Sequence, residues 1–189
     1  MHMFSLETLP VSRWKNGGGE TREICRIPSD EPGGDFAWRA SIATIERDGD
    51  FSCFPGVDRV IALLSGDGVD LSGDGMDLSG DGWRHRLTLH QPFAFAGEQA
   101  ISARLCGGVS LDFNIMVDRR CCRAEVTVVS GTTTWTPDTA GVAYVLAGHW
   151  RTDTHRLTSG EGAWWRSSGA CWTPDDDNAV LLLTAIHAR

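Results

Sequence analysis

The chain has 189 residues, a mass of 20.6 kDa and a formal net charge of −8, which suit a globular protein of one large domain or two small ones. The acidic balance and the lack of a run of Lys or Arg argue against nucleic acid as a partner. No apolar stretch approaches the roughly 20 residues that span a bilayer, and residues 1–10 do not have the pattern of a secretory signal. We therefore expect a cytoplasmic protein with no membrane partner. In that compartment its cysteines should be reduced.

The first feature along the chain is a group of small and polar residues, WKNGGGETRE, that runs from Trp14 to Glu23. Three consecutive glycines let a backbone approach a ligand closely or expose its amides. The order of residues does not fit the phosphate-binding loop G-x-x-x-x-G-K-[ST], and no βαβ pattern surrounds it. We therefore do not expect a nucleotide site here.

Short segments rich in β-branched and aromatic residues follow, bounded by Gly, Pro, Asp or Ser. No segment keeps the helical i, i+3, i+4, i+7 spacing for three turns. The pattern predicts an all-β protein, and many short strands are typical of a barrel or sandwich. The expected strands are Phe36–Ile45, Arg59–Leu64, Phe93–Ala96, Ile101–Leu105, Ser110–Val117, Ala124–Val129, Val142–Leu146 and Val180–Ile186.

Two of these strands carry polar residues on one face. Arg39 and Ser41 share a face of the first strand, and Asp112 and Asn114 share a face of the fifth. On the plainer interpretation this face is exposed to solvent, and Arg39 and Asp112 form a surface ion pair worth roughly 0–1 kcal/mol. On the alternative interpretation the same residues line the mouth of a barrel and form a polar ligand pocket.

Between the first two strands, residues 49–59 read GDFSCFPGVDR. The Phe-Pro-Gly sequence favours a rigid turn with an aromatic anchor. Arg59 begins the next strand, where its guanidinium could bind a carboxylate with two parallel hydrogen bonds.

A seven-residue unit is repeated in Ser65–Gly82, which reads SGDGVDLSGDGMDLSGDG. Gly- and Asp-rich repeats also form calcium-binding β-rolls, but those have a period of about nine and several turns. We favour a hairpin loop that was lengthened by duplication.

A second, weaker repeat relates VIALLSG, followed by HRLTLHQPFAFAGE, to VAYVLAG, followed by HRLTSGEGAWW. It aligns Gly66 with Gly148 and His85 with His155. Each copy has an apolar strand that ends in Gly, then a hairpin, a polar strand and an aromatic strand. This order of strands is typical of the two halves of a tandem cupin-type barrel. The boundary between the halves would fall near residues 118–123. We expect the tryptophans of the second aromatic strand to pack in a core.

Metal binding is not expected. Metal cupins use two histidines one residue apart, and the six histidines here include no H-x-H. The six cysteines include no C-x-x-C, and none has metal-finger spacing from a histidine. We therefore predict neither a metal nor another cofactor.

Four motifs in this order resemble the HutD/Ves family: WKNGGG-x-TREI, F-x-WR-x-S-x-A, G-x-FS-x-FPG-x-DR and LDFNIM. The resemblance covers essentially the whole chain. It implies an RmlC-like bicupin fold. It also implies a link to histidine utilisation, in which HutD members are suspected to bind an intermediate such as formylglutamate, or to the stress response of Ves members. Neither branch of the family has a secure biochemical activity, and the SGDG-rich hairpin departs from the family length.

Together these observations predict two cupin units, residues 1–120 with a ligand pocket and a shorter unit of residues 121–189. We expect a metal-independent binder of a small anionic metabolite with a regulatory or stress-related role, and homodimers through edge strands, as cupins often form. Arg39 and Arg22 would pair with a carboxylate, while Trp14 and Trp38 would wall the site. The expected ligand-binding residues are Trp14, Asn16, Thr21, Arg22, Trp38, Arg39, Ser41, Ser52, Arg59, Asp112 and Asn114.

A metal-free enzyme of the isomerase or epimerase type, acting on a small carboxylate, is the alternative. Such an enzyme needs a positioned base, often a histidine paired with an aspartate. Asp112 is the only obvious acid on the polar face, and the sequence places no histidine beside it. We therefore favour a binding protein with no catalytic residue.

Overall fold

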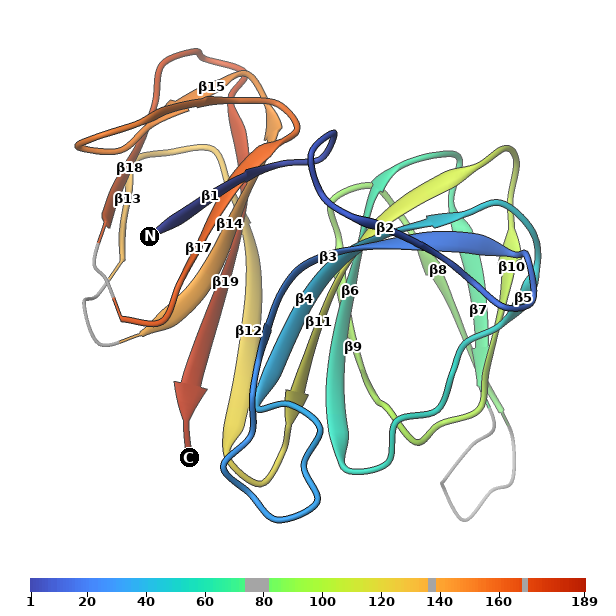
Figure 1. Ribbon diagram of the computed structural model, residues 1–189. Coiled ribbons are helices and arrows are strands. Elements are labelled where there is room, and N and C mark those ends of the chain that lie inside the picture. The colour runs from blue at the N-terminus through green and yellow to red at the C-terminus, as the bar shows by residue number, and fades with distance from the viewer. Residues whose placement is uncertain (74–81, 136–138, 168–169) are drawn as a thin grey trace. The chain divides into compact units, whose positions relative to one another are not determined.

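A computed structural model describes residues 1–73, 82–135, 139–167 and 170–189. Every regular element in these ranges is a β-strand (Figure 1), and within them there is no helix long and apolar enough to cross a bilayer. The all-β prediction is therefore confirmed for the described part of the chain. The chain divides into two compact units, Pro10–Cys121 and a second one made of Met1–Leu9 with Cys122–Arg189. They are called here the N-terminal unit and the C-terminal unit.

The N-terminal unit consists of two antiparallel sheets. The first has the strand order β2 (Val11–Arg13), β3 (Gly19–Ile27), β4 (Trp38–Ile45), β11 (Ser110–Asp118), β6 (Val57–Ser65) and β9 (Pro92–Ala96). The second has the order β5 (Gly49–Asp50), β10 (Ile101–Leu105), β7 (Val69–Gly73) and β8 (Trp83–Leu87). Apolar side chains from both sheets form one buried cluster, which includes Ile45, Ile61, Leu71, Leu87 and Ile101.

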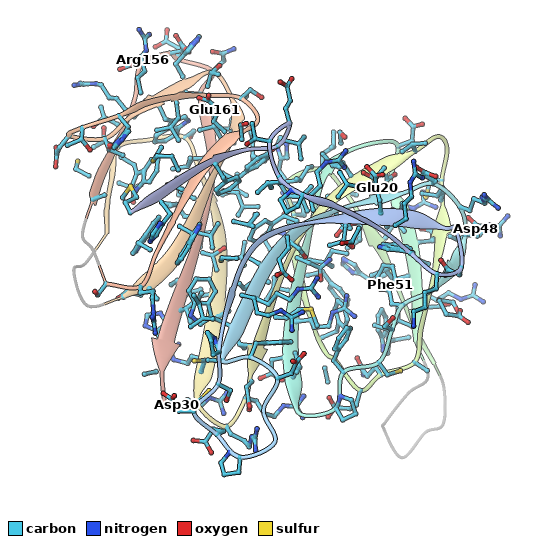
Figure 2. The ribbon with its side chains drawn as sticks, viewed as in Figure 1. Glu20, Asp30, Asp48, Phe51, Arg156 and Glu161 are labelled. Atoms are coloured by element: carbon cyan, nitrogen blue, oxygen red, sulfur yellow. The ribbon has the colours of Figure 1, made fainter. Side chains whose placement is uncertain are left out.

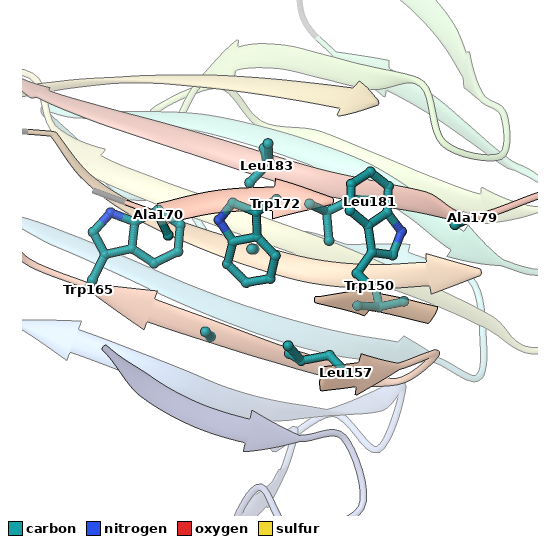
Figure 3. Close-up of a cluster of buried hydrophobic side chains, with 11 residues drawn as sticks. Trp150, Leu157, Trp165, Ala170, Trp172, Ala179, Leu181 and Leu183 are labelled. Carbon is teal, nitrogen blue, oxygen red and sulfur yellow. The ribbon is translucent and has the colours of Figure 1, made fainter. Parts of the chain in front are cut away.

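The C-terminal unit repeats this two-sheet plan. Its larger sheet has the order β1 (His2–Ser5), β17 (Glu161–Trp165), β14 (Ala140–Ala147), β19 (Val180–Ala188) and β12 (Cys122–Val129). The smaller has the order β13 (Thr133–Trp135), β18 (Ala170–Pro174), β15 (His149–Arg151) and β16 (Arg156–Thr158). Three buried tryptophans, Trp150, Trp165 and Trp172, dominate its core (Figure 3), as expected for the aromatic strand that contains Trp165.

The first residues of the chain belong to the C-terminal unit, which differs from the expected assignment of residues 1–120 to one unit. Strand β1 pairs antiparallel with β17, in a register that sets His2 opposite Trp164 and Phe4 opposite Gly162. The His2 and Trp164 rings stack at 4.2 Å, and the Phe4 and Tyr144 ring centroids lie 6.2 Å apart. These contacts join residues that are between 140 and 162 positions apart in the sequence, so no local pattern of residues predicts them.

The internal repeat has a structural counterpart. Strands β6 to β9 and β14 to β17 follow each other in the same order, and Gly66 and Gly148 both adopt positive φ, +114° and +68°, just after the first strand of each copy. Glycine takes such angles more easily than any other residue. The duplicated segment, expected to be a hairpin loop, begins as strand β7, which pairs with β8 and β10. The rest of it, residues 74–81, lies outside the described residues.

The eight expected strands are all present, with boundaries that differ by a few residues at most. Strand β3 was not expected, because its polar stretch of Glu20, Thr21, Arg22 and Glu23 lacks the apolar alternation of a half-buried strand. In the structure, β3 pairs with β4 along almost its whole length.

The pairing of β1 with β17 can be tested by deleting residues 1–6. We expect the backbone amides of Glu161–Trp164 to exchange hydrogen about tenfold faster or more, because they lose the neighbouring strand and its two aromatic contacts. Hydrogen-exchange mass spectrometry measures this, and peptides from Trp38–Ile45 serve as the internal control. Loss of protection in β4 with none in β17 would contradict the assignment.

Candidate functional site

One cavity in the N-terminal unit, with a volume of about 610 Å³, collects most of the predicted site residues. Its lining comes from strands β2, β3, β4, β5, β6 and β11, from the turn between β2 and β3, and from the segment after β5 that carries Phe51, which is labelled in Figure 2. Of the eleven predicted residues, the cavity is lined by Trp14, Asn16, Thr21, Arg39, Ser41, Ser52, Arg59, Asp112 and Asn114. The polar face of β4 and β11 therefore faces a cavity rather than open solvent.

Two predicted site residues lie elsewhere. Trp38 is buried on the face of β4 opposite to Arg39, because side chains alternate along a strand. Arg22 follows Thr21 on β3, so its side chain points to the other face of the sheet. Its guanidinium forms an ion pair with Glu20 at 2.6 Å and donates to Thr44 Oγ1 at 3.3 Å. Neither residue lines the cavity, so the structure corrects their predicted roles as a wall and as a carboxylate partner.

Arg59 is the most deeply buried cation of the cavity, with 7% of its surface exposed. Its guanidinium carbon lies 4.8 Å, 5.5 Å and 5.6 Å from the ring centroids of Phe95, Phe51 and Phe54. Nη1 donates to the Ser52 carbonyl at 3.3 Å, and burial lowers the pKa of this group to about 10. Among the residues that the structure describes, no carboxylate lies within ion-pairing distance of Arg59, and its Nε has no hydrogen-bond partner.

Asn114 joins Arg59 to Asp112. Arg59 Nη2 donates to Asn114 Oδ1 at 3.1 Å, and Asn114 Nδ2 donates to Asp112 Oδ1 at 2.6 Å. Asp112 is 1% exposed, and burial raises the pKa of its carboxyl to about 7, although the Asn114 hydrogen bond and the Arg59 charge both favour the ionised form. The cavity thus contains an acid that can be neutral or charged near neutral pH.

Arg39 is held differently. Its Nε donates to Glu23 Oε2 at 2.6 Å, so its charge already has a carboxylate partner. The surface pair between Arg39 and Asp112 that the plainer interpretation gave is not formed, because the register sets Arg39 opposite Met116, four residues along β11 from Asp112.

The glycine-rich segment forms the turn between β2 and β3 at the cavity. Asn16 Oδ1 accepts from the Gly18 amide at 2.9 Å, and Gly17 has a φ of +67°, which glycine takes most easily. Trp14 Nε1 donates to Thr21 Oγ1 at 2.8 Å. These bonds fix the turn and place Trp14 and Asn16 on the cavity wall.

Several lining residues were not predicted: Arg13, Lys15, Ala43, Asp50, Phe51, Phe54 and Met116. Continuing the alternation of β4 and β11 by two positions would have given Ala43 and Met116. Phe51 and Phe54 belong to the Phe-Pro-Gly segment, whose aromatic residues were interpreted as an anchor for a turn rather than as neighbours of Arg59.

The described residues contain no group of three or more His, Cys, Asp or Glu side chains placed to hold a metal ion. The described lining of the cavity also contains no histidine. Within the described chain, the polar groups that the cavity offers a ligand are therefore guanidinium, ammonium, amide and hydroxyl groups, together with two carboxyl groups.

The comparison with known proteins agrees with the motifs and the two-unit fold. The family model described as HutD matches residues 6–182. The chain belongs to the HutD family. Protein Ves of Cronobacter sakazakii is 47% identical over 167 residues, which cover 88% of this chain and 87% of that protein. Protein Ves of Citrobacter koseri is 45% identical over 166 residues, with 87% and 83% covered. The resemblance to HutD and Ves proteins is thereby confirmed.

Solved structures show the same fold. HutD from Pseudomonas fluorescens SBW25, described for a formate condition, superposes with a TM-score of 0.83 at 28% identity and covers 99% of this chain and 98% of that one. A mutant of the oxalate decarboxylase OxdC of Bacillus subtilis superposes with a TM-score of 0.67 over 100% of this chain and 78% of that one, at 10% identity. The second likeness shows the fold alone, and together they confirm the bicupin prediction.

Asp112 gives a pH-dependent stability test. The pKa of its carboxyl group is about 7 in the folded protein and 3.8 for the unperturbed group. Between roughly pH 4 and pH 7 the folded state therefore binds more protons than the unfolded state. As a result, the free energy of unfolding falls as the pH rises through this range. Asp112→Asn removes this titration and keeps the acceptor oxygen for Asn114. We expect similar stability of both proteins at pH 4, and a more stable variant at pH 8 by on the order of 4 kcal/mol.

Denaturant unfolding at the two pH values measures this difference. A stability difference between variant and wild type that does not grow from pH 4 to pH 8 would show that Asp112 is already ionised in the folded protein at low pH.

Proposed function

We propose that the protein binds a small carboxylate in the cavity of the N-terminal unit, without the help of a metal. The observation that carries this proposal is Arg59, a buried guanidinium on the cavity wall with no carboxylate partner among the described residues. The carboxyl of Asp112 is separated from Arg59 by Asn114 and forms no ion pair with it, and a buried charge without a directly paired counter-charge is costly even where aromatic rings and carbonyl groups surround it. An incoming carboxylate supplies the missing counter-charge through charge-assisted hydrogen bonds, each worth about 1.5–3 kcal/mol.

The other charges of the lining support an anionic ligand. The lining has four basic residues, Arg13, Lys15, Arg39 and Arg59, against two acidic ones, Asp50 and Asp112, in a chain whose formal net charge is −8. The cavity thus has the opposite charge balance to the whole chain. Since Arg39 is paired with Glu23, Arg59 is the principal carboxylate partner in this proposal and Arg39 the second one.

The polar groups of the lining favour a ligand with a second polar function. Ser41 is buried on the cavity wall, and its hydroxyl can bond a polar group of a ligand, whereas the amide oxygen and nitrogen of Asn114 already bond to Arg59 and Asp112. N-Formylglutamate, which carries two carboxylates and a formamide, fits this chemistry, and formate appears in the description of the HutD structure from Pseudomonas fluorescens. We therefore propose formylglutamate, or a related intermediate of histidine utilisation, as the ligand, with a regulatory or stress-related role for the complex.

Catalysis has one observation in its favour, the buried Asp112 with its raised pKa, which is typical of an acid or base in an enzyme. However, the hydrogen bond of Asp112 is to the Asn114 amide, and no histidine lines the described cavity. An isomerase or epimerase would have to use Asp112 alone as its base. Binding therefore stays the primary proposal.

A thermal-shift screen with formate, glutarate and N-formyl-L-glutamate tests the proposal. Saturation to about 100 times the dissociation constant adds roughly 2.7 kcal/mol, which for a chain of this size raises the melting temperature by about 5–10 °C. Arg59→Met fills the same space without the charge, and we expect it to abolish the shift. Arg39→Met should reduce it less, because Glu23 already neutralises Arg39.

The matched control is Arg104→Met, which removes an arginine from β10 outside this cavity and should leave the ligand-induced shift unchanged. If a carboxylate shifted the wild type and Arg59→Met equally, the ligand would not sit beside Arg59, and the proposal would fail. A screen in which none of the three carboxylates shifted the wild type would count against it as well.

A further inference from the structure

The hydrogen bonds between Arg59, Asn114 and Asp112 have only one consistent orientation. A guanidinium can only donate, so Asn114 must present its carbonyl oxygen to Arg59 and its NH₂ group to Asp112. Asp112 Oδ1 therefore always accepts, whether the carboxyl group is charged or neutral. Any proton on Asp112 has to sit on the other oxygen, Oδ2, which has no hydrogen bond among those described.

Asp112 lies in a row of the sheet with apolar neighbours. Its register partners are Ala43 on β4 and Leu63 on β6. Asp112 is nevertheless one of the residues that line the cavity, so a ligand there can reach it. No protein group within the described residues donates a hydrogen bond to it except Asn114.

The charged residues that line the same cavity as Asp112 come from several elements, with Arg13 on β2 among them. Arg59 lies on β6, Arg39 on β4 with its partner Glu23 on β3, Lys15 in the turn between β2 and β3, and Asp50 on β5. Arg59 favours an ionised Asp112, whereas burial favours the neutral acid. These two influences oppose each other while the cavity has no ligand.

A bound carboxylate would change this balance. It would sit beside Arg59 and partly cancel the positive charge that favours an ionised Asp112. Two carboxylates that share one buried site cannot both stay ionised at low cost, so one of them takes a proton. Asp112, which is buried among apolar neighbours, is the group that would take it.

We propose that the cavity binds its carboxylate ligand together with one proton, which Asp112 takes from solvent and then shares with the ligand by donating its O–H. This rests on the proposed function of the same cavity and adds a specificity residue to it. The ligand it selects is a carboxylate with two acceptor groups, one for the guanidinium of Arg59 and one for the acid of Asp112. No covalent bond of the ligand changes, and the proton returns to solvent on release.

The proposal fixes how affinity depends on pH. Where Asp112 is already neutral in the free protein, no proton is taken up and the dissociation constant is constant. Above the pKa of Asp112 in the free protein, which is about 7, each complex takes up one proton and the dissociation constant rises up to tenfold for each pH unit. An ordinary surface carboxylate site would show no such change between pH 7 and pH 9.

Isothermal titration calorimetry with formate, glutarate and N-formyl-L-glutamate at pH 6, 7, 8 and 9 tests this on the whole chain. We expect the wild type to bind at least ten times more weakly at pH 9 than at pH 7. Titrations at pH 8.5 in two buffers of different ionisation enthalpy should show the uptake of about one proton per bound ligand. Asp112→Asn mimics the neutral acid, so it should bind with the same affinity at every pH and take up no proton.

Asp50→Asn is the matched control, because it removes the other acidic residue of the lining with the same change in charge. It should keep the slope of affinity against pH that the wild type shows. If Asp112→Asn does not fold, the ¹³C chemical shift of the Asp112 carboxyl group in the wild type reports its protonation state instead. We expect this shift to show a neutral acid in the complex at pH 8.

The outcomes separate the two proposals. Binding by the wild type with no dependence on pH leaves the proposed function standing and overturns proton uptake. A pH slope that persists in Asp112→Asn, or a folded Asp112→Asn that binds at no pH, also overturns it. If the wild type binds none of the three carboxylates at any pH, the proposed function fails and proton uptake fails with it.

Discussion

The arrangement of side chains in the cavity of the N-terminal unit centres on one buried positive charge. Arg59 extends from β6 onto the inner side of the larger sheet, where three phenylalanine rings surround its guanidinium and the Ser52 carbonyl and Asn114 accept its hydrogen bonds. Each of these partners is neutral. A charge solvated in this way is kept in place without being neutralised, and that is the condition in which a cavity attracts an anion.

The two units solve the same packing problem in different ways. The C-terminal unit fills the space between its sheets with large indole rings, Trp150, Trp165 and Trp172 (Figure 3). The N-terminal unit places smaller and polar side chains on the cavity-facing side of its larger sheet, among them Ser41, Ala43 and Asn114. A cavity remains there, and the apolar cluster built around Ile45, Ile61 and Leu71 stabilises the sheets that form it. The cavity thus depends on the side chains of one unit and not on the fold, which both units share.

Much of the site could be predicted, because alternation along a strand is a local property. The positions of Arg39 and Ser41 on one face of β4, and of Asp112 and Asn114 on one face of β11, follow from the two-residue period of a strand. The same rule excludes Trp38 from that face, so its inclusion among the ligand-binding residues neglected the alternation that had been used for its neighbours. Arg22 and Thr21 are adjacent on β3, so their side chains also point to opposite faces of the sheet. This could not be used for the prediction, because the weak apolar pattern of β3 kept it from being identified as a strand.

The sequence by itself determined the all-β class, the tandem repeat and most of the polar residues of the cavity, since these depend on periodicity and on motifs of neighbouring residues. Only the tertiary structure decided which of the arginines that line the described cavity has no carboxylate within ion-pairing distance. Glu23 reaches Arg39 because β3 pairs with β4, while Asp112 bonds to Asn114 on its own strand and leaves Arg59 among aromatic rings. It also decided that β1 completes the sheet of the C-terminal unit. Ion pairs and strand neighbours depend on distances between segments far apart in the chain, and no local pattern of residues encodes those distances.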